Sequence, residues 1–154
     1  MDTDFNFAEE SKQLSELQSG QNWTSCNIGN FEGIKNYVME NKEINLKCLS
    51  KLFLHKVLGL TGTEVSFNTV PAGTKPIVKH RHRENEELII VLSGEGILYV
   101  DDNTINVKEG SVIRIAPDGI RTISTPETSS LTYICIQTKS KSLKHYTLTD
   151  AEML

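Results

Sequence analysis

Strand signals recur through most of this chain, and their spacing is the feature that most restricts its fold. From Lys51 onward, short runs rich in β-branched and aromatic residues return about every 8 to 12 residues, with Gly, Pro, Asn and Asp between them. Short strands at this spacing are typical of an all-β sandwich or barrel. The expected strands cover residues 51–58, 64–70, 77–83, 87–92, 96–100, 103–107, 111–115, 122–124 and 131–137.

The chain divides into three expected parts. Its 154 residues suffice for one domain that buries a sizeable core without disulfides or metals as staples. The parts are an N-terminal extension over 1–45, a barrel over 46–140 and a C-terminal tail over 141–154. Within the extension, apolar spacing indicates helices over 7–17 and 31–39 and a strand over 23–28. We expect this extension to pack on its own barrel or to swap between barrels.

Charge and cysteine content exclude several classes of partner. The formal net charge is −4, so no general basic surface would attract nucleic acid or anionic lipid. Apolar runs such as 88–92 are far too short to span a bilayer. The cysteines Cys26, Cys48 and Cys135 are an odd number without C-x-x-C spacing, and no apolar N-terminal stretch resembles a signal peptide. We therefore expect a reduced, cytoplasmic protein without nucleic-acid or membrane partners, and a buried packing role for Cys135.

The expected strand over 87–92 is apolar on both faces, unlike a strand with one face in water. Its outer face therefore needs a cover, which could be another strand, the N-terminal extension or a partner subunit. Apolar sheet faces and open edges favour association, and a cyclic dimer is the commonest closed assembly. The sequence thus predicts a homodimer.

Two histidines and a carboxylate form the main candidate site. His80 and His82 are separated by one residue in the expected strand over 77–83. Successive side chains of a strand alternate between its faces, so both imidazoles project from one side, about 6.5 to 7 Å apart. The strand that starts at Glu87 is expected to pair antiparallel to this one. Two neutral imidazoles and a carboxylate would then meet, which is the ligand chemistry of a divalent metal such as Zn, Ni, Fe or Mn.

The stretch from Gly73 to Gly94 resembles the first signature of the cupin family, in which a glycine, a His-x-His pair, a glutamate and a second glycine follow in order. Its first glycine lies one position further upstream than in the usual pattern. Glu87 has the spacing of the family's ligand glutamate, while Glu86 is expected on the opposite face. The resemblance covers about 60–137. It implies a double-stranded β-helix, the jelly-roll barrel of cupins, with the two histidines and Glu87 as metal ligands.

The second cupin signature is recognisable from Gly110 to Gly119, with one extra residue before its proline. Its histidine is missing, because Thr122 stands at that position, where we expect the side chain to face the barrel interior. A hydroxyl oxygen is a weaker ligand than imidazole for these metals, so the missing histidine should weaken binding. His55, Gln137 or water remain open as substitutes.

Four side chains are candidates for contact with a substrate: Thr122, Arg121, Gln137 and Tyr133. The planar guanidinium of Arg121 could hold an anionic group near the barrel mouth, or Arg121 could be a plain surface residue. Arg114 alternates with isoleucines and is expected on the outer face, paired with a surface acid.

Two functions remain open from the sequence. One is a metal-binding cupin that holds a small organic molecule, as an isomerase, an epimerase or an oxygenase-like enzyme, since the family includes all of these. The other is a metal-free, non-catalytic module that binds a sugar or metabolite. The missing histidine favours the second function. Glu87 opposes it, because a carboxylate facing two imidazoles without an ion requires protonated or ligand-bound histidines.

Overall fold

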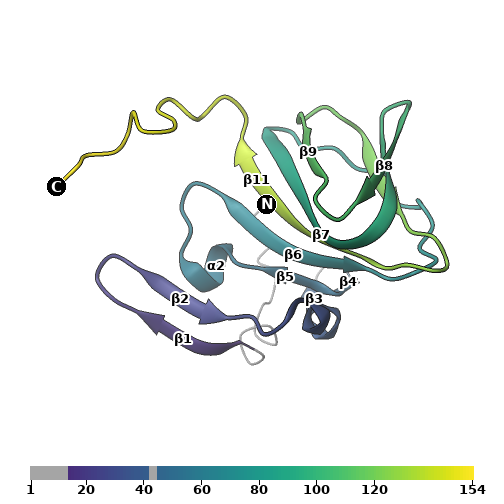
Figure 1. The fold of residues 1–154 in the computed structure, drawn as a ribbon, viewed down its shortest axis with the longest axis horizontal. Helices are drawn as coiled ribbons and strands as arrows, with labels where there is room; N and C mark the ends of the chain where they lie inside the picture. Colours follow the sequence, from purple (N-terminus) through teal and green to yellow (C-terminus); the bar gives the residue numbers. More distant parts are fainter. Residues whose placement is uncertain (1–13, 42–44) are drawn as a thin grey trace.

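The fold is organised around one long strand, β7, in the computed structural model, which describes residues 14–41 and 45–154 (Figure 1). The first half of β7 pairs with β11 and β9, and its second half pairs with β8 and β10. All these pairings are antiparallel, so the two halves of a jelly-roll barrel share a strand. The strands of this region are β7 (Asn85–Val100), β8 (Asn103–Lys108), β9 (Val112–Ile115), β10 (Arg121–Ser124) and β11 (Leu131–Lys139).

Gly94 lets β7 pass from one half of the barrel to the other. Its φ of 77° lies in the left-handed region, and a Cβ at this position would collide with the backbone carbonyl of Ser130. The register with β11 also shifts between Thr132 and Tyr133, as at a β-bulge. The expected break into two strands, 87–92 and 96–100, is therefore wrong. The glycines bend a continuous strand instead of ending it.

Two further strands extend the sheet beyond β11. They are β6 (Glu64–Val70), which has the predicted bounds, and β5 (Lys51–Phe53). The predicted strand over 51–58 is wrong in its second half, where the helical turn α2 (His55–Leu58) follows β5. Gly59 ends this turn with a φ of 66°, the left-handed conformation that glycine adopts without steric cost. Strands β8 to β11 lie close to their predicted ranges.

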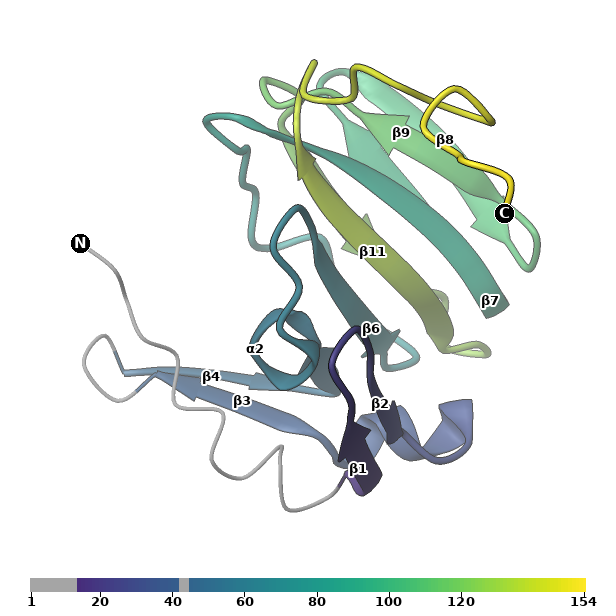
Figure 2. The same cartoon turned by 90° about the vertical axis from the view of Figure 1, so that its left-hand side faces the viewer.

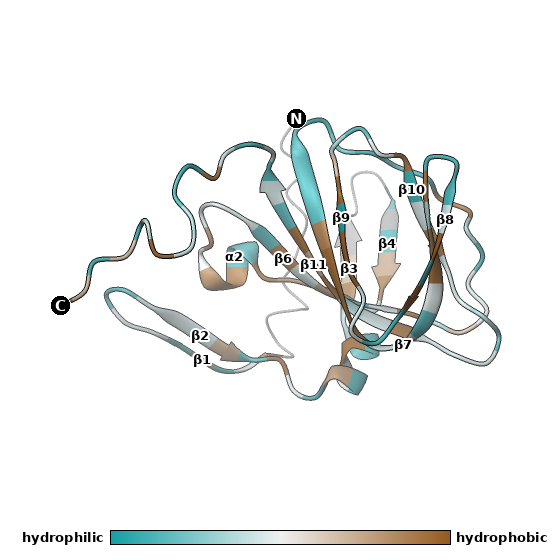
Figure 3. Cartoon of the chain, turned by 45° about the horizontal axis from the view of Figure 1, so that its top comes forward, coloured by the Kyte–Doolittle hydropathy of each residue, from teal (hydrophilic) through white to brown (hydrophobic). Residues whose placement is uncertain are grey.

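Apolar side chains fill the barrel interior. Along β7, Ile89 and Val91 alternate with half-buried residues and point inward, as the period of two requires. The bent second half of β7 adds Leu98, which is 2% exposed. Hydrophobic residues run along the middle of these strands (Figure 3). The buried members of this cluster are Ile89, Val91, Leu98, Val107, Ile115, Leu131, Tyr133 and Cys135.

The described part of the N-terminal extension, together with a strand just after it, forms two antiparallel strand pairs and a 3-10 helix, η1, below the barrel (Figures 1 and 2). Its elements are β1 (Ser15–Ser19), β2 (Thr24–Asn27), η1 (Phe31–Asn36), β3 (Val38–Asn41) and β4 (Leu46–Leu49). The strand predicted over 23–28 is confirmed. The helix predicted over 7–17 is wrong at its described end, where β1 begins, and 7–13 lie outside the described residues. The helix predicted over 31–39 is only the short η1, because the chain is extended again from Tyr37.

A second apolar cluster joins this extension to the barrel of the same chain. Ile34 and Tyr37 pack with Leu52 and Leu54, and all four are buried. Phe67 of β6 contributes its ring, which stacks on Phe31 with centroids 5.7 Å apart. The extension therefore covers the outer face of β5 and β6. No helix in the described ranges is long and apolar enough to cross a membrane.

The outer face of β7, β9 and β11 also carries an apolar patch beside the Glu86–Arg114 ion pair. Leu88 and Ile90 lie next to Ile136 and Ile134 on β11, and Ile90 lies next to Val112 on β9. Val112 is 61% exposed and the other four are half-buried. An apolar face of this kind on a sheet favours association with a second copy of the chain.

We predict that light scattering gives about twice the chain mass of 17.2 kDa. Ile90→Lys places a charge on the outer face and should give a monomer. Ile120→Lys, at a position that is 45% exposed in the turn before β10, should leave the dimer intact. A concentration-independent monomer for the unmodified protein would contradict the prediction.

Candidate functional site

Glu87 lies inside the barrel near the start of β7. It shares the inward face with Ile89 and Val91 and is 5% exposed. Glu86 points the other way, where its Oε2 lies 2.5 Å from Nη2 of Arg114. The expected orientations of Glu86 and Arg114 are therefore confirmed. Of the two adjacent acids, only Glu87 is available inside the barrel.

His80 and His82 approach Glu87 from a segment that is not a regular strand. The predicted strand over 77–83 is wrong: within it, the only ladder pairing is a single bridge between His80 and Arg121. The His82 backbone N–H donates instead to the carbonyl of Pro117, at 3.1 Å. Pro76, just before the segment, has no N–H to offer a neighbouring strand. The histidines are thus held by β10 and the loop before it, and not by pairing with β7 as expected.

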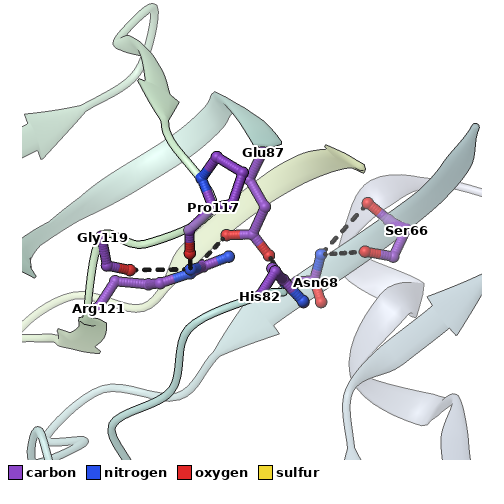
Figure 4. A network of polar contacts seen from close by, with 7 residues as sticks. All are labelled: Ser66, Asn68, His82, Glu87, Pro117, Gly119 and Arg121. Atoms are coloured by element: carbon purple, nitrogen blue, oxygen red, sulfur yellow. Dashed lines mark hydrogen bonds and ion pairs between the residues drawn. The ribbon is translucent and has the colours of Figure 1, made fainter. Parts of the chain in front are cut away.

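The three predicted ligand side chains nevertheless converge. Their closest ligand atoms all lie within 4.8 Å of one another. His82 Nε2 donates to Glu87 Oε1 at 2.7 Å (Figure 4), and the two imidazole rings meet edge to face with centroids 5.5 Å apart. This cluster could hold a metal ion.

Arg121 completes the cluster from β10. Its side chain is 2% exposed, and its Nε donates to Glu87 Oε2 at 3.0 Å. Its Nη1 donates to the carbonyls of Gly119 at 2.8 Å and Pro117 at 3.3 Å (Figure 4). Its Nη2 is buried, and none of the described residues forms a hydrogen bond with it. The residue is therefore part of the site, and it is not on the surface, which was one of the sequence-based alternatives.

Thr122 lies on the other face of β10. Arg121 pairs with Val100, which packs in the barrel core, whereas Thr122 pairs with Tyr99. Ser124, which shares the face of Thr122, donates from its Oγ to the Tyr99 hydroxyl at 3.4 Å. Thr122 is buried, at 8% exposed, but its side chain lies on the face opposite Arg121, so the expectation that it faces the same interior as Glu87 is wrong. Position 121 supplies the inward side chain in the second signature.

The surroundings of Glu87 fix its charge and that of His80. Burial alone would raise the pKa of Glu87, but the hydrogen bond from His82 and the charge of Arg121 outweigh it and lower that pKa. Burial and the charge of Arg121 also lower the pKa of His80. At neutral pH the site therefore offers an ionised carboxylate and a neutral His80 imidazole, the forms that bind metal.

Three side chains of β11 line the inward face beside Glu87. Gln137 is the direct cross-strand neighbour of Glu87 and is half-buried. Tyr133 lies in the apolar core, where burial raises its pKa. Burial, with a smaller effect of nearby Glu87, raises the pKa of the Cys135 thiol to about 12, so Cys135 is a neutral core residue. The expected packing role of Cys135 is confirmed.

The sequence analysis missed Asn68. This residue of β6 is 1% exposed, and its Nδ2 donates to Ser66 Oγ at 3.0 Å and to the Ser66 carbonyl at 3.2 Å (Figure 4). Its Oδ1 is buried and accepts no hydrogen bond within the part of the chain that the structure describes. The signal was present, since Glu64, Ser66 and Asn68 occupy alternate positions and so put polar side chains on one face of the strand. His55, considered as a substitute ligand, is exposed in α2 and is not among the three residues of the cluster.

A cavity of about 500 Å³ lies elsewhere, beside the middle of β7 after Gly94 and the end of β10 away from Arg121. None of its lining residues belongs to the cluster. They include Glu95, Asn106, Lys108, Ser111 and Ser124.

Comparisons with known proteins agree on one family for this chain. The cupin domain model matches residues 66–137. A cupin protein from Bacteroides fragilis is similar in structure, with 43% identity over 68% of this chain and 88% of that chain and a TM-score of 0.65. A Photorhabdus luminescens protein shares the fold, with 22% identity over 60% of this chain and 76% of that chain and a TM-score of 0.53. An uncharacterized Methanocaldococcus jannaschii protein is 38% identical over 48 residues, which span 31% of this chain and 38% of that protein.

Removing the cation beside Glu87 should destabilise the barrel. Arg121→Gln leaves a buried carboxylate without its ion pair, which should lower the free energy of unfolding by about 3 to 5 kcal/mol. Arg114→Gln breaks a pair in which Arg114 is 59% exposed, and should cost about 1 kcal/mol or less. Urea unfolding of both variants measures the difference. Equal losses would contradict the structural role of Arg121.

Proposed function

Since the chain belongs to the cupin family, by its domain match and its likeness to the Bacteroides fragilis cupin, we propose that it binds a divalent metal ion through His80, His82 and Glu87. We further propose that a small organic molecule binds beside the ion. Cupins include isomerases, epimerases and oxygenases, and the fold alone does not choose among these reactions.

The convergence of the three ligand atoms within 4.8 Å is the observation that supports this proposal most directly. The donor set is also chemically suitable, because two imidazoles and one carboxylate form a common open site for first-row metals such as Zn, Ni, Fe or Mn. When bound, the ion would supply a Lewis acid that polarises an oxygen of the organic molecule. Glu87 would use one carboxylate oxygen while Arg121 holds the other, an arrangement that orients a ligand side chain.

A metal-free binding module remains a second candidate, and one contact favours it. Both oxygens of Glu87 already have donors, one from His82 and one from Arg121. The guanidinium balances the carboxylate charge without any ion. The ion pair with Arg121 therefore answers the objection that, without a metal, the negative charge of Glu87 would have no compensating positive charge.

Metal content separates the two candidates. In protein purified without an affinity tag or chelator, plasma mass spectrometry should find about one divalent ion per chain. His82→Ala and Glu87→Gln should each lose that ion, because each removes a ligand from a set of three.

Glu86→Gln is the matched control for Glu87→Gln, since the neighbouring acid points to the outer face and should keep the metal. A wild-type protein without bound metal, even after dialysis against the divalent ions, would overturn the proposal in favour of the metal-free module. Loss of metal in Glu86→Gln but not in Glu87→Gln would show that the wrong acid has been assigned.

A further inference from the structure

Arg121 occupies the inward position of the second signature, beside the three proposed metal ligands. We infer that Arg121 limits an ion at this site to three protein ligands and weakens its binding, with its guanidinium in the place of a fourth ligand. This inference rests on the proposed metal site, but its test can be read separately.

The backbone places position 121 next to His80. The N–H of His80 donates to the Arg121 carbonyl at 3.1 Å, and the N–H of Arg121 donates back at 2.9 Å. The side chain of Arg121 reaches the same carboxylate that accepts from His82. The side chain at position 121 therefore contacts Glu87 within the cluster, whereas residue 122 lies on the opposite face of β10.

The guanidinium is fixed in this place. Its Nη1 is held by the carbonyls of Pro117 and Gly119, and its Nε by Glu87, so three hydrogen bonds oppose its leaving the site. Arginine has no lone pair to donate to a metal and does not lose its proton in proteins. Position 121 therefore contributes a permanent positive charge where an imidazole would contribute a ligand.

This charge has two consequences for a bound ion. It repels a second cation in an interior where charges are poorly screened. It also occupies one oxygen of Glu87, so the carboxylate can offer only its other oxygen without breaking the pair. Both effects lower metal affinity and leave coordination positions open for water or a small molecule.

Arg121→His tests the inference, because it removes the cation and adds an imidazole at the same position. Calorimetric titration of metal-free protein with Zn²⁺ should show binding at least about 10-fold tighter than in the wild type, or about 1.4 kcal/mol. The control Thr122→His adds the same imidazole one residue later, on the face beside Tyr99, and should leave the affinity unchanged.

Arg121→Gln removes the charge without adding a ligand, and its Zn²⁺ affinity should lie between those of the wild type and Arg121→His.

The visible absorption of bound Co²⁺ provides a second readout, which would not change if Arg121 had a purely structural role. Its d–d bands should shift in Arg121→His, because a nitrogen ligand is added, and stay in place in Thr122→His. Circular dichroism of each variant checks that the barrel is folded. If Arg121→His does not fold, the inference is judged on folded Arg121→Gln, where unchanged Zn²⁺ affinity overturns it.

The outcomes for the inference and for the proposed function are distinct. If the wild type binds Zn²⁺ and folded Arg121→His binds no more tightly, the inference is overturned and the metal site stands. If the wild type binds none and Arg121→His does, the inference is supported and the proposed metal function fails. Tighter binding in Thr122→His but not in Arg121→His would also overturn the inference.

Discussion

The site depends on the fact that both halves of the barrel share strand β7. Glu87 lies in its first half, and Val100, the pairing partner of Arg121, lies at its end, after the bend at Gly94. The ion pair between Glu87 and Arg121 therefore connects residues anchored in opposite halves of the barrel. Without the bend, the strand could not bring its two ends to the same interior, and the carboxylate would have no buried cation.

Charge compensation explains why polar residues are tolerated in this interior. A buried ion pair recovers its desolvation cost only when its remaining hydrogen-bonding atoms are satisfied. Glu87 meets this condition with donors to both oxygens, and Arg121 meets it except at Nη2. The contacts between Glu87 and Arg121 that stabilise the barrel thus also set the charge of the proposed site and the number of its ligand atoms that are available to an ion. Stability and metal affinity oppose each other at position 121.

Much of the barrel was predictable from local patterns. Strand β6 follows from its alternating residues, and β8 from the turn before it, where Asp101 adopts a φ of 53°. Errors arose where local signals and long-range contacts disagree. The apolar run from Lys51 suggests one strand, but the chain turns into α2 before Gly59. The glycines near Gly94 resemble a turn, although only the tertiary pairing with β11 shows that the strand continues.

The first signature predicted the inward side chains correctly and the second did not, for a physical reason. His80 and His82 lie on one side of any extended backbone, because side chains alternate whether or not the segment is hydrogen-bonded into a sheet. Their convergence with Glu87 therefore survives the loss of the predicted strand. Which residue of the second signature points inward depends instead on the conformation of the loop before β10, which contains one extra residue. A shift of one position exchanges the two faces of a strand, so the side chain that reaches Glu87 is Arg121 and not Thr122. Spacing within one extended segment thus predicts side-chain direction more securely than spacing counted across a loop.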